Sequence, residues 1–175
     1  NTMKEIDEEE FIELREIGKG SSFQVKLAYH ILDEKLIAIK CLYDLKEDPK
    51  KLIEREISFY SKCEHPLFPK FYGKIKNKNS IAIEFINGNT LFHADKSKFS
   101  YEDKIKIIFE IILCVEYLHE NKIIYRDLKP SNIMIDQNNT AVLIDFDRTI
   151  NEDKKDNHIV QTKDFGSDFV APEVN

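Results

Sequence analysis

Short apolar runs broken by turns fill the first part of the chain, and this pattern predicts β-strands. Residues 23–29 alternate between apolar and polar positions, and residues 36–42 form a tight apolar run. Glycine and polar clusters separate the runs and supply the turns. The predicted strands cover residues 11–14, 23–29, 36–42, 71–76 and 80–86, with turns at 18–22 and 77–79 and a connector at 87–89.

Two stretches change to the spacing of an α-helix. Residues 50–62 place Leu52, Ile53, Ile57 and Tyr60 on one face, with charged residues on the other side. His65-Pro66 ends this predicted helix.

The second predicted helix runs from residue 101 to about 121. Ser100 is its expected N-cap, and Asp103 stands where a capping box has Glu. Its apolar stripe consists of Ile105, Ile108, Phe109, Ile112, Val115 and Leu118. A hairpin is predicted from residues 133–135 and 141–144, followed by a long polar loop over 149–168.

Composition and charge exclude several classes of protein. At 175 residues the chain can bury one sizeable core or two small lobes, and 42% apolar with 33% charged residues is typical of a soluble globular protein. The net charge of −6 argues against nucleic acid or an anionic membrane as the main partner. Residues 105–118 are interrupted by charges and do not span a bilayer, and the acidic start shows no signal peptide. Cys41, Cys63 and Cys114 are expected to be reduced thiols of a cytoplasmic protein.

The candidate chemistry lies in residues 125–132, Tyr-Arg-Asp-Leu-Lys-Pro-Ser-Asn, and in the Asp-Phe-Asp that begins at Asp145. These segments bring together a possible base, Asp127, a cation, Lys129, and a metal-binding amide, Asn132. Asp145 adds a second carboxylate on the following hairpin. Phosphoryl transfer from a nucleotide uses these four kinds of group together.

This pattern resembles the catalytic loop and Asp-Phe-Gly motif of the eukaryotic protein kinase domain. The resemblance covers about residue 11 to Glu173 and implies an α+β, bilobal fold. It places a small, mostly β N-lobe at residues 11–86 and the start of a mostly α C-lobe at 87–175. Residues 1–175 are then a single, partial kinase domain that stops just after Ala171-Pro172-Glu173. Kinases continue there with further helices, so we expect the isolated chain to be marginally stable.

The resemblance also implies a nucleotide site, with ATP and Mg²⁺ as cofactors. Residues 18–20 would cover the phosphates, and Lys40, in Ile-Ala-Ile-Lys, would bind them. A carboxylate must orient that lysine; Glu56 is the candidate and Glu54 its rival. The implied nucleotide-binding residues are Gly18, Lys19, Gly20, Val25, Ala38, Lys40, Glu84, Ile86 and Met134.

In the same scheme Asp127 handles the substrate hydroxyl, Lys129 neutralises the transferred phosphate, and Asn132 and Asp145 bind metal. Lys129 is the residue usual in kinases that modify serine or threonine. The resemblance also implies a column of aromatic rings at Tyr60, Phe71, Tyr125 and Phe146. Possible phosphorylation sites are Thr149, Thr162 and Ser167. Arg126 would be the cation that pairs with a phosphate on this loop.

Three positions depart from the family pattern: Phe23 and Asp147 replace glycines, and Tyr125 replaces the usual histidine. The expected function is that of a protein serine/threonine kinase with a protein substrate. A pseudokinase, which binds or scaffolds without transfer, is the first alternative, because Phe23 and Asp147 favour it. A small-molecule kinase of the same fold is the second, opposed by the protein-kinase type of motif at Leu128-Lys129-Pro130. The sequence does not indicate the oligomeric state.

Overall fold

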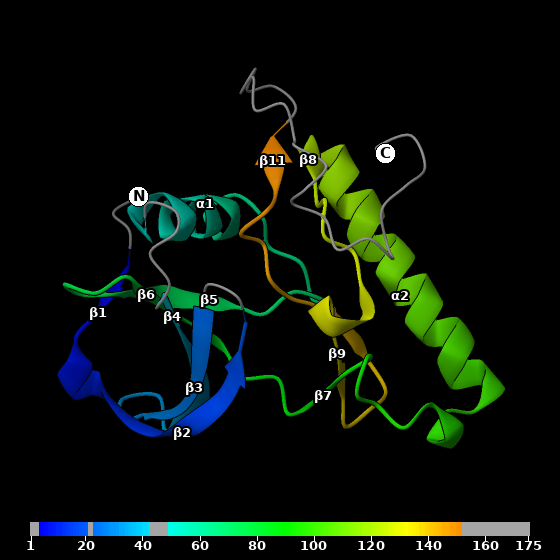
Figure 1. The fold of residues 1–175 in the computed structure, drawn as a ribbon, viewed down its shortest axis with the longest axis horizontal. Helices are drawn as coiled ribbons and strands as arrows, with labels where there is room; N and C mark the ends of the chain where they lie inside the picture. The colour runs from blue at the N-terminus through cyan, green and yellow to red at the C-terminus, as the bar shows by residue number, and fades with distance from the viewer. Residues whose placement is uncertain (1–3, 21–22, 43–48, 152–175) are drawn as a thin grey trace. The chain divides into compact units, whose positions relative to one another are not determined.

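A computed structural model describes residues 4–20, 23–42 and 49–151, with the side chains of 49–51 excepted. The chain divides into two compact units between Asn87 and Gly88 (Figure 1). We call them the N-terminal unit and the C-terminal unit and describe each by itself. The expected residues 171–173 and the candidate sites Thr162 and Ser167 lie outside the described residues.

The N-terminal unit contains a six-stranded sheet in the order β1-β5-β6-β4-β3-β2. All neighbours in it are antiparallel except β1 and β5, which are parallel. The predicted strands are confirmed with shifts at their ends; the last of them stops at Glu84, so Ile86 lies beyond it. The strands are β1 (Glu5–Ile6), β2 (Phe11–Lys19), β3 (Phe23–His30), β4 (Lys35–Leu42), β5 (Phe71–Ile75) and β6 (Ser80–Glu84), with a 3-10 turn η1 (Glu8–Glu10) between β1 and β2.

The sequence analysis missed β1, which precedes the expected start of the N-lobe. Backbone N–H groups of Lys74 and Lys76 donate to the carbonyls of Lys4 and Ile6, each at 3.0 Å. Ile6 is buried in the core cluster of the sheet together with Phe11, Ala28, Ile37, Ile39, Ile75 and Ala82. The short strand therefore both pairs with the edge of β5 and fills the core.

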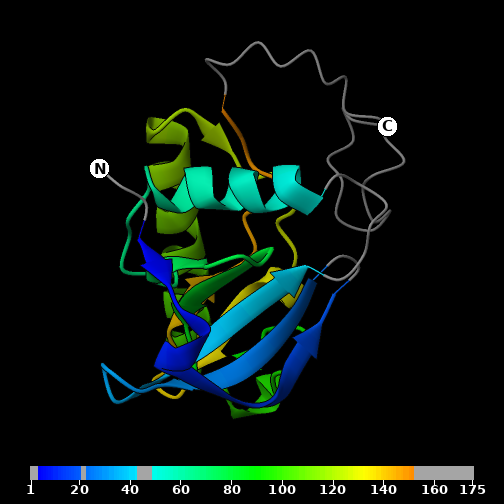
Figure 2. The same cartoon turned by 90° about the vertical axis from the view of Figure 1, so that its left-hand side faces the viewer.

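Alternation along β4 separates the two faces of the sheet. Ile37 and Ile39 belong to the core cluster, so Ala38 and Lys40 project to the opposite face. Helix α1 (Pro49–Tyr60) lies across the sheet within this unit (Figure 2). Its predicted apolar face is confirmed, because the side chains of Leu52, Ile53, Ile57 and Tyr60 are all buried.

The C-terminal unit is built on the long helix α2 (Tyr101–Glu120). Its predicted start is confirmed: Ser100 Oγ accepts from the Asp103 N–H at 3.0 Å, and Asp103 Oδ2 accepts from the Ser100 N–H at 2.9 Å. The hairpin is confirmed as β9 and β10, and β7 adds a third strand to it. The other elements are β7 (Gly88–Thr90), η2 (Lys96–Lys98), β8 (Ile123–Ile124), η3 (Pro130–Asn132), β9 (Ile133–Asp136), β10 (Ala141–Leu143) and β11 (Ile150–Asn151).

Two expectations for loops were wrong in part. Residues 88–90 form β7, which pairs with β9, rather than a connector only. Residues 150 and 151, placed in the long polar loop, form β11 and pair with β8. In both places the strand exists because a distant segment supplies its hydrogen bonds, which no local pattern reveals.

The apolar stripe predicted for α2 is buried only in part. Leu118 is buried, but Ile105, Ile108, Phe109 and Ile112 are each at least half exposed. The fully buried positions are Ile107, Cys114 and Leu118. Helix α2 is apolar on more than one side, so periodicity alone could not select the side that packs on β10. Among the described residues, no helix combines the length and the apolar character needed to cross a bilayer.

Gly88 allows β7 to approach β9 closely, and it provides a test of this pairing. A Cβ at residue 88 would lie 1.9 Å from the carbonyl oxygen of Ile135, so Gly88→Ala must separate the two strands. We expect a loss of about 2 kcal/mol or more in the free energy of unfolding, measured by urea denaturation. Gly20→Ala is the control, because its Cβ would meet no atom closer than 3.7 Å. Equal stability of the two variants would contradict the close pairing.

Candidate active site

Three polar side chains meet in the loop that follows β8 in the C-terminal unit. Lys129 Nζ donates to both carboxylate oxygens of Asp127, at 2.8 and 3.0 Å. The side-chain amide of Asn132, Nδ2, donates to the backbone oxygen and to Oδ2 of Asp127, both at 2.9 Å. Asn132 is buried and the Asp127 side chain is only 12% exposed. The structure therefore brings together three of the residues that the sequence singled out, with Asp127 at their centre.

The backbone on both sides of this cluster adopts an uncommon conformation. Arg126 and Asp145 have φ angles of 68° and 67°, in the left-handed region. Such angles are unfavourable for residues other than glycine, least so for Asp and Asn, and they concentrate at functional sites. Arg126 is restrained by its Nε, which donates to the carbonyl of Arg148 at 2.7 Å. Asp147 is not among the described residues with positive φ, so this conformation does not need a glycine at position 147.

Tyr125 packs its ring on Phe146, with centroids 5.7 Å apart and an interplanar angle of 73°. Its hydroxyl donates to the carbonyl of Ile144. Burial, and then the negative charges of Asp145, Asp127 and Asp147, raise the pKa of Tyr125 well above its ordinary value. The hydroxyl therefore keeps its proton at neutral pH. The other expected ring pair, Tyr60 and Phe71, is stacked within the N-terminal unit at 5.4 Å.

A buried ion pair joins β4 to α1 in the N-terminal unit. Lys40 Nζ lies 2.9 Å from each carboxylate oxygen of Glu56, and both residues are almost wholly buried. Glu54, the rival carboxylate, is exposed. Because α1 buries the face that carries Ile53 and Ile57, it also turns Glu56 toward the sheet.

Phe23 lies directly against this pair. Its buried ring is centred 4.1 Å from Lys40 Nζ, within cation–π range. Its carbonyl accepts from the N–H of Gly20 at 2.7 Å, which closes the end of the glycine turn. From the sequence, Phe23 was identified only as a departure from the family pattern, and its contact with Lys40 was not foreseen.

The remaining candidates for nucleotide binding are divided between the units. On neighbouring strands of the sheet, Gly18 is paired with Val25, and Val25 with Lys40. Ala38 projects to the same face as Lys40, and Glu84 ends β6 with its N–H bonded to the Lys70 carbonyl. Lys19 ends β2 and is exposed, Gly20 is also exposed, Ile86 follows β6 half-buried, and Met134 lies half-buried on β9 of the C-terminal unit.

The proposed metal ligands fit a cation that keeps much of its hydration. Mg²⁺ is bound through one or two protein ligands, with water and phosphate oxygens completing its shell. Asn132 and Asp145 supply such a sparse set. Since Asp127 binds the amide nitrogen of Asn132, the amide oxygen is the atom of that side chain suited to ligate a cation. Within the described part of the chain, no three His, Cys, Asp or Glu residues are grouped for tighter metal binding.

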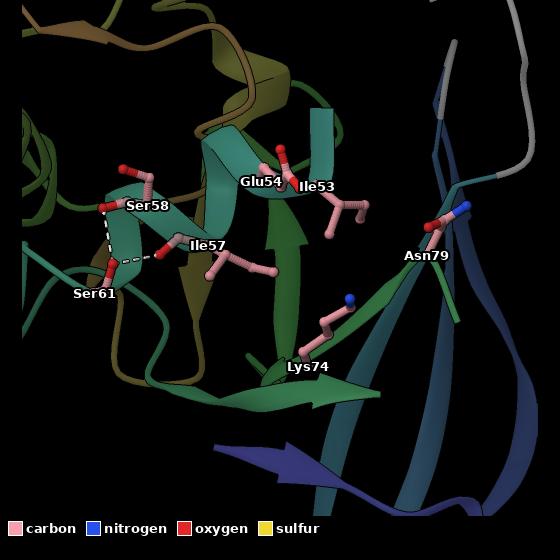
Figure 3. Close-up of a pocket in the computed structure, with 7 residues that line it drawn as sticks. All are labelled: Ile53, Glu54, Ile57, Ser58, Ser61, Lys74 and Asn79. Carbon is pink, nitrogen blue, oxygen red and sulfur yellow. Dashed lines mark hydrogen bonds between the residues drawn. The ribbon is translucent and has the colours of Figure 1, made fainter. Parts of the chain in front are cut away.

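A small pocket of about 240 Å³ lies elsewhere in the N-terminal unit (Figure 3). Helix α1 supplies most of its lining, together with residues of β5 and of the turn after it. Apart from Glu54, the rival of Glu56, none of the candidate site residues lines it. The lining residues are Ile53, Glu54, Ile57, Ser58, Ser61, Lys74 and Asn79.

Comparison with known proteins gives the family. The model of the protein kinase domain matches residues 11–175, which is nearly the whole chain. The chain belongs to the protein kinase domain family. The fold described above agrees with this assignment, with a mostly β sheet unit followed by a unit built on a long helix.

Several curated kinases are similar to this kinase domain over most of its length. The carbon catabolite-derepressing protein kinases of Candida glabrata and Saccharomyces cerevisiae are both 34% identical to it, over 92% of this chain. The serine/threonine-protein kinase Sgk1-B of Xenopus laevis is 32% identical over the same share. The chain spans only 27%, 26% and 39% of the length of these relatives.

Thr149 is the one candidate phosphorylation site within the described residues of this kinase domain. Its hydroxyl donates to the carbonyl of Phe146 at 2.8 Å. Phosphorylation there would replace that hydrogen bond, so the contact gives no support to Thr149 as a regulatory site.

The buried pair of Lys40 and Glu56 allows a double-mutant test. Glu56→Leu removes the carboxylate from the buried ammonium of Lys40. Lys40→Met removes the ammonium from the buried carboxylate of Glu56. We expect each single change to reduce the free energy of unfolding by about 3–5 kcal/mol, and the double change to restore most of it. Urea unfolding of the four proteins measures the coupling. Additive losses in the double variant would show that the two charges do not depend on each other.

Proposed function

We propose that this protein is an ATP- and Mg²⁺-dependent protein serine/threonine kinase. The observation that carries the proposal is the cluster of Asp127, Lys129 and Asn132, held in one loop by hydrogen bonds of 2.8–3.0 Å. The relatives named above as protein kinases support it. Lys129 favours serine or threonine as the acceptor, by its resemblance to kinases of that type.

In this proposal Asp127 orients the acceptor hydroxyl and takes its proton. The hydroxyl oxygen forms a bond to the γ-phosphorus of ATP, the bond between that phosphorus and the bridging oxygen breaks, and ADP leaves with the bond's electron pair. Lys129, which is hydrogen-bonded to Asp127, would neutralise charge on the phosphoryl oxygens. Bound Mg²⁺ would stabilise negative charge on the phosphates, with Asn132 and Asp145 as its protein ligands.

We assign nucleotide binding to the face of the sheet that carries Lys40. Glu56 holds the lysine ammonium in place, and a fixed ammonium can bind phosphate oxygens without first being oriented. Val25 and Ala38 offer apolar contact to an adenine ring, and the resemblance to kinases adds Met134 of the C-terminal unit as a further candidate. The backbone of Glu84 and Ile86 would bond the adenine edge, and Gly18, Lys19 and Gly20 would cover the phosphates.

A nucleotide-binding pseudokinase is the second candidate, because Phe23 covers the Lys40 ammonium that phosphates would approach. Asp147 supports that alternative less, because its backbone shows no strain that a glycine would relieve. A small-molecule kinase remains the third candidate, and a screen of sugars and aminoglycosides as acceptors tests it.

We further propose a cytoplasmic location. Cys41, Cys63 and Cys114 carry free thiols. Burial raises the pKa of Cys63, and it raises that of Cys114 to about 12, so both thiols stay protonated and unreactive at neutral pH. Free, unreactive cysteines are typical of proteins in reducing compartments.

Replacing Asp127 tests the proposed transfer. Asp127→Asn keeps the size of the side chain but removes its negative charge, so we expect phosphate transfer by the full-length natural protein to fall at least about 100-fold. Nucleotide affinity should stay within about threefold, because Asp127 serves the acceptor and not the nucleotide. Radiolabelled phosphate transfer and nucleotide titration measure the two effects. Asp33→Asn, which removes a surface carboxylate paired with Lys35, is the control. Unchanged transfer in Asp127→Asn would exclude the proposed chemistry and favour the scaffold.

Replacing Phe23 tests whether its ring hinders nucleotide binding at Lys40. Phe23→Gly removes a cation–π contact with Lys40 that contributes about 0.5–2 kcal/mol. We therefore expect the dissociation constant for ATP to fall by about 2- to 30-fold. Phe23→Leu keeps an apolar side chain without the ring and should give an intermediate value. Fluorescent-nucleotide titration measures the affinity, with melting temperatures taken in parallel. Weaker binding in a folded Phe23→Gly variant would mean that the ring supports the site.

A further inference from the structure

The sheet of the N-terminal unit includes a strand that lies outside the residues matched by the kinase-domain model. The match begins at residue 11, whereas Glu5 and Ile6 form β1. This strand lies at the edge of the sheet beside β5, to which it is parallel (Figure 2). The carbonyls of Lys4 and Ile6 accept from the backbone N–H groups of Lys74 and Lys76. The sixth strand is therefore a feature of this chain that the family match does not account for.

One side chain anchors this strand in the sheet. Ile6 is 1% exposed and belongs to the same core cluster as Ile37 and Ile39 of β4. Burial of an isoleucine in a close-packed core is a strong and specific attachment. Strand β5 admits β1 closely, because a Cβ at Gly73 would lie 2.6 Å from the carbonyl oxygen of Lys4. A side chain at position 73 would therefore force β1 away from the sheet.

The other contacts of this segment are exposed and weak. Asp7 Oδ1 lies 3.0 Å from Lys76 Nζ, and Glu8 Oε1 lies 2.6 Å from Lys78 Nζ. These four side chains are about half exposed, and surface ion pairs of this kind contribute little to stability. We call residues 4–8 the N-terminal strap. A two-residue strand with one buried side chain can open locally while the rest of the sheet stays folded.

Ile6 shares its core cluster with the strand that carries Lys40. Along β4, Ile37 and Ile39 face this cluster, and Lys40 faces the opposite side of the sheet, where it meets Glu56. A side chain that leaves a packed core creates a cavity into which its neighbours relax only partly. Release of Ile6 would therefore displace β4 and, with it, the ammonium of Lys40.

We propose that docking of the N-terminal strap is coupled to nucleotide binding through the pair of Lys40 and Glu56, which makes the strap a regulatory element. With Ile6 in the core, β4 holds the lysine ammonium against Glu56, and nucleotide binds tightly. With the strap released, the ion pair is held less well, and binding is weaker. Because the two states differ in nucleotide affinity, nucleotide in turn favours the docked strap. This inference rests on the proposed function, which assigns nucleotide binding to Lys40.

Hydrogen exchange in the full-length natural protein tests the coupling without any substitution. The N–H groups of Lys74 and Lys76 are bonded to the strap, so they exchange when it is released. We expect a saturating non-hydrolysable ATP analogue with Mg²⁺ to slow their exchange about fivefold or more. The N–H of Lys98, bonded to the carbonyl of Asp95 at the turn η2, is the control and should exchange at an unchanged rate. Equal rates for Lys74 and Lys76 with and without nucleotide overturn the inference.

Replacing Ile6 in the same protein tests the coupling from the other side. Ile6→Asp places a charge in the core and should release the strap, so we expect the Kd for ATP to rise about fivefold or more. Ile6→Val keeps an aliphatic side chain and should bind ATP nearly as the wild type does. Leu32→Asp makes a comparable change at a 71% exposed position of the same unit and is the control. Fluorescent-nucleotide titration measures the affinity, and the exchange of Lys74 and Lys76 reports the release of the strap.

The outcomes separate this inference from the proposed function. A folded Ile6→Asp variant that releases the strap and binds ATP as tightly as the wild type overturns the coupling, even if the wild type is an active kinase. If Ile6→Asp does not fold, the exchange of Lys74 and Lys76 in the wild type decides. A wild type that binds ATP but transfers no phosphate overturns the proposed function, while both measurements still decide the role of the strap. A wild type that binds no ATP overturns both.

Discussion

A lysine ammonium buried beneath a helix is stable only where a carboxylate meets it, and the arrangement of the N-terminal unit depends on this requirement. Lys40 and Glu56 are nearly inaccessible to solvent and lie 2.9 Å apart. The pair restrains the rotation of α1 about its own axis, since another rotation would separate these two buried charges. The C-terminal unit obeys the same rule for a buried neutral group: the side-chain amide of Asn132 donates both to the carboxylate and to the backbone carbonyl of Asp127.

The sequence predicted those elements that are encoded by neighbouring residues. The cap of α2 at Ser100 and Asp103 and the buried face of α1 follow from local spacing, and the structure agrees with both. The strands β1 and β7 could not be predicted, because two or three residues have no usable period. Their stability comes from partners on β5 and β9 that are distant in sequence. The packed side of α2 was also beyond prediction, because apolar residues occur around much of the helix.

The candidate site shows the same division. The residue types and spacing of Asp127, Lys129 and Asn132 indicated the chemistry, and the choice of Glu56 over Glu54 followed from its place in the motif. Contacts between side chains on different strands could not be predicted from the sequence, because no local pattern places the ring of Phe23 over Lys40. The hydrogen bond from the Tyr125 hydroxyl to the Ile144 carbonyl was equally hidden, because it joins two segments that are 19 residues apart in the sequence.

The three departures from the family pattern differ in what they change physically. Asp147 stands where glycine is usual, but its φ angle is not positive, so the conformation of this loop does not require a glycine there. Tyr125 keeps the aromatic packing on Phe146. Its hydroxyl, which remains protonated among three carboxylates, donates a hydrogen bond to the Ile144 carbonyl. Phe23 alone lies next to a charge, the Lys40 ammonium, that is proposed to bind phosphate. None of the three replaces a residue that is proposed to take part in the transfer. The departures therefore concern how tightly nucleotide and cation are bound, and the groups proposed to carry out the transfer remain in place.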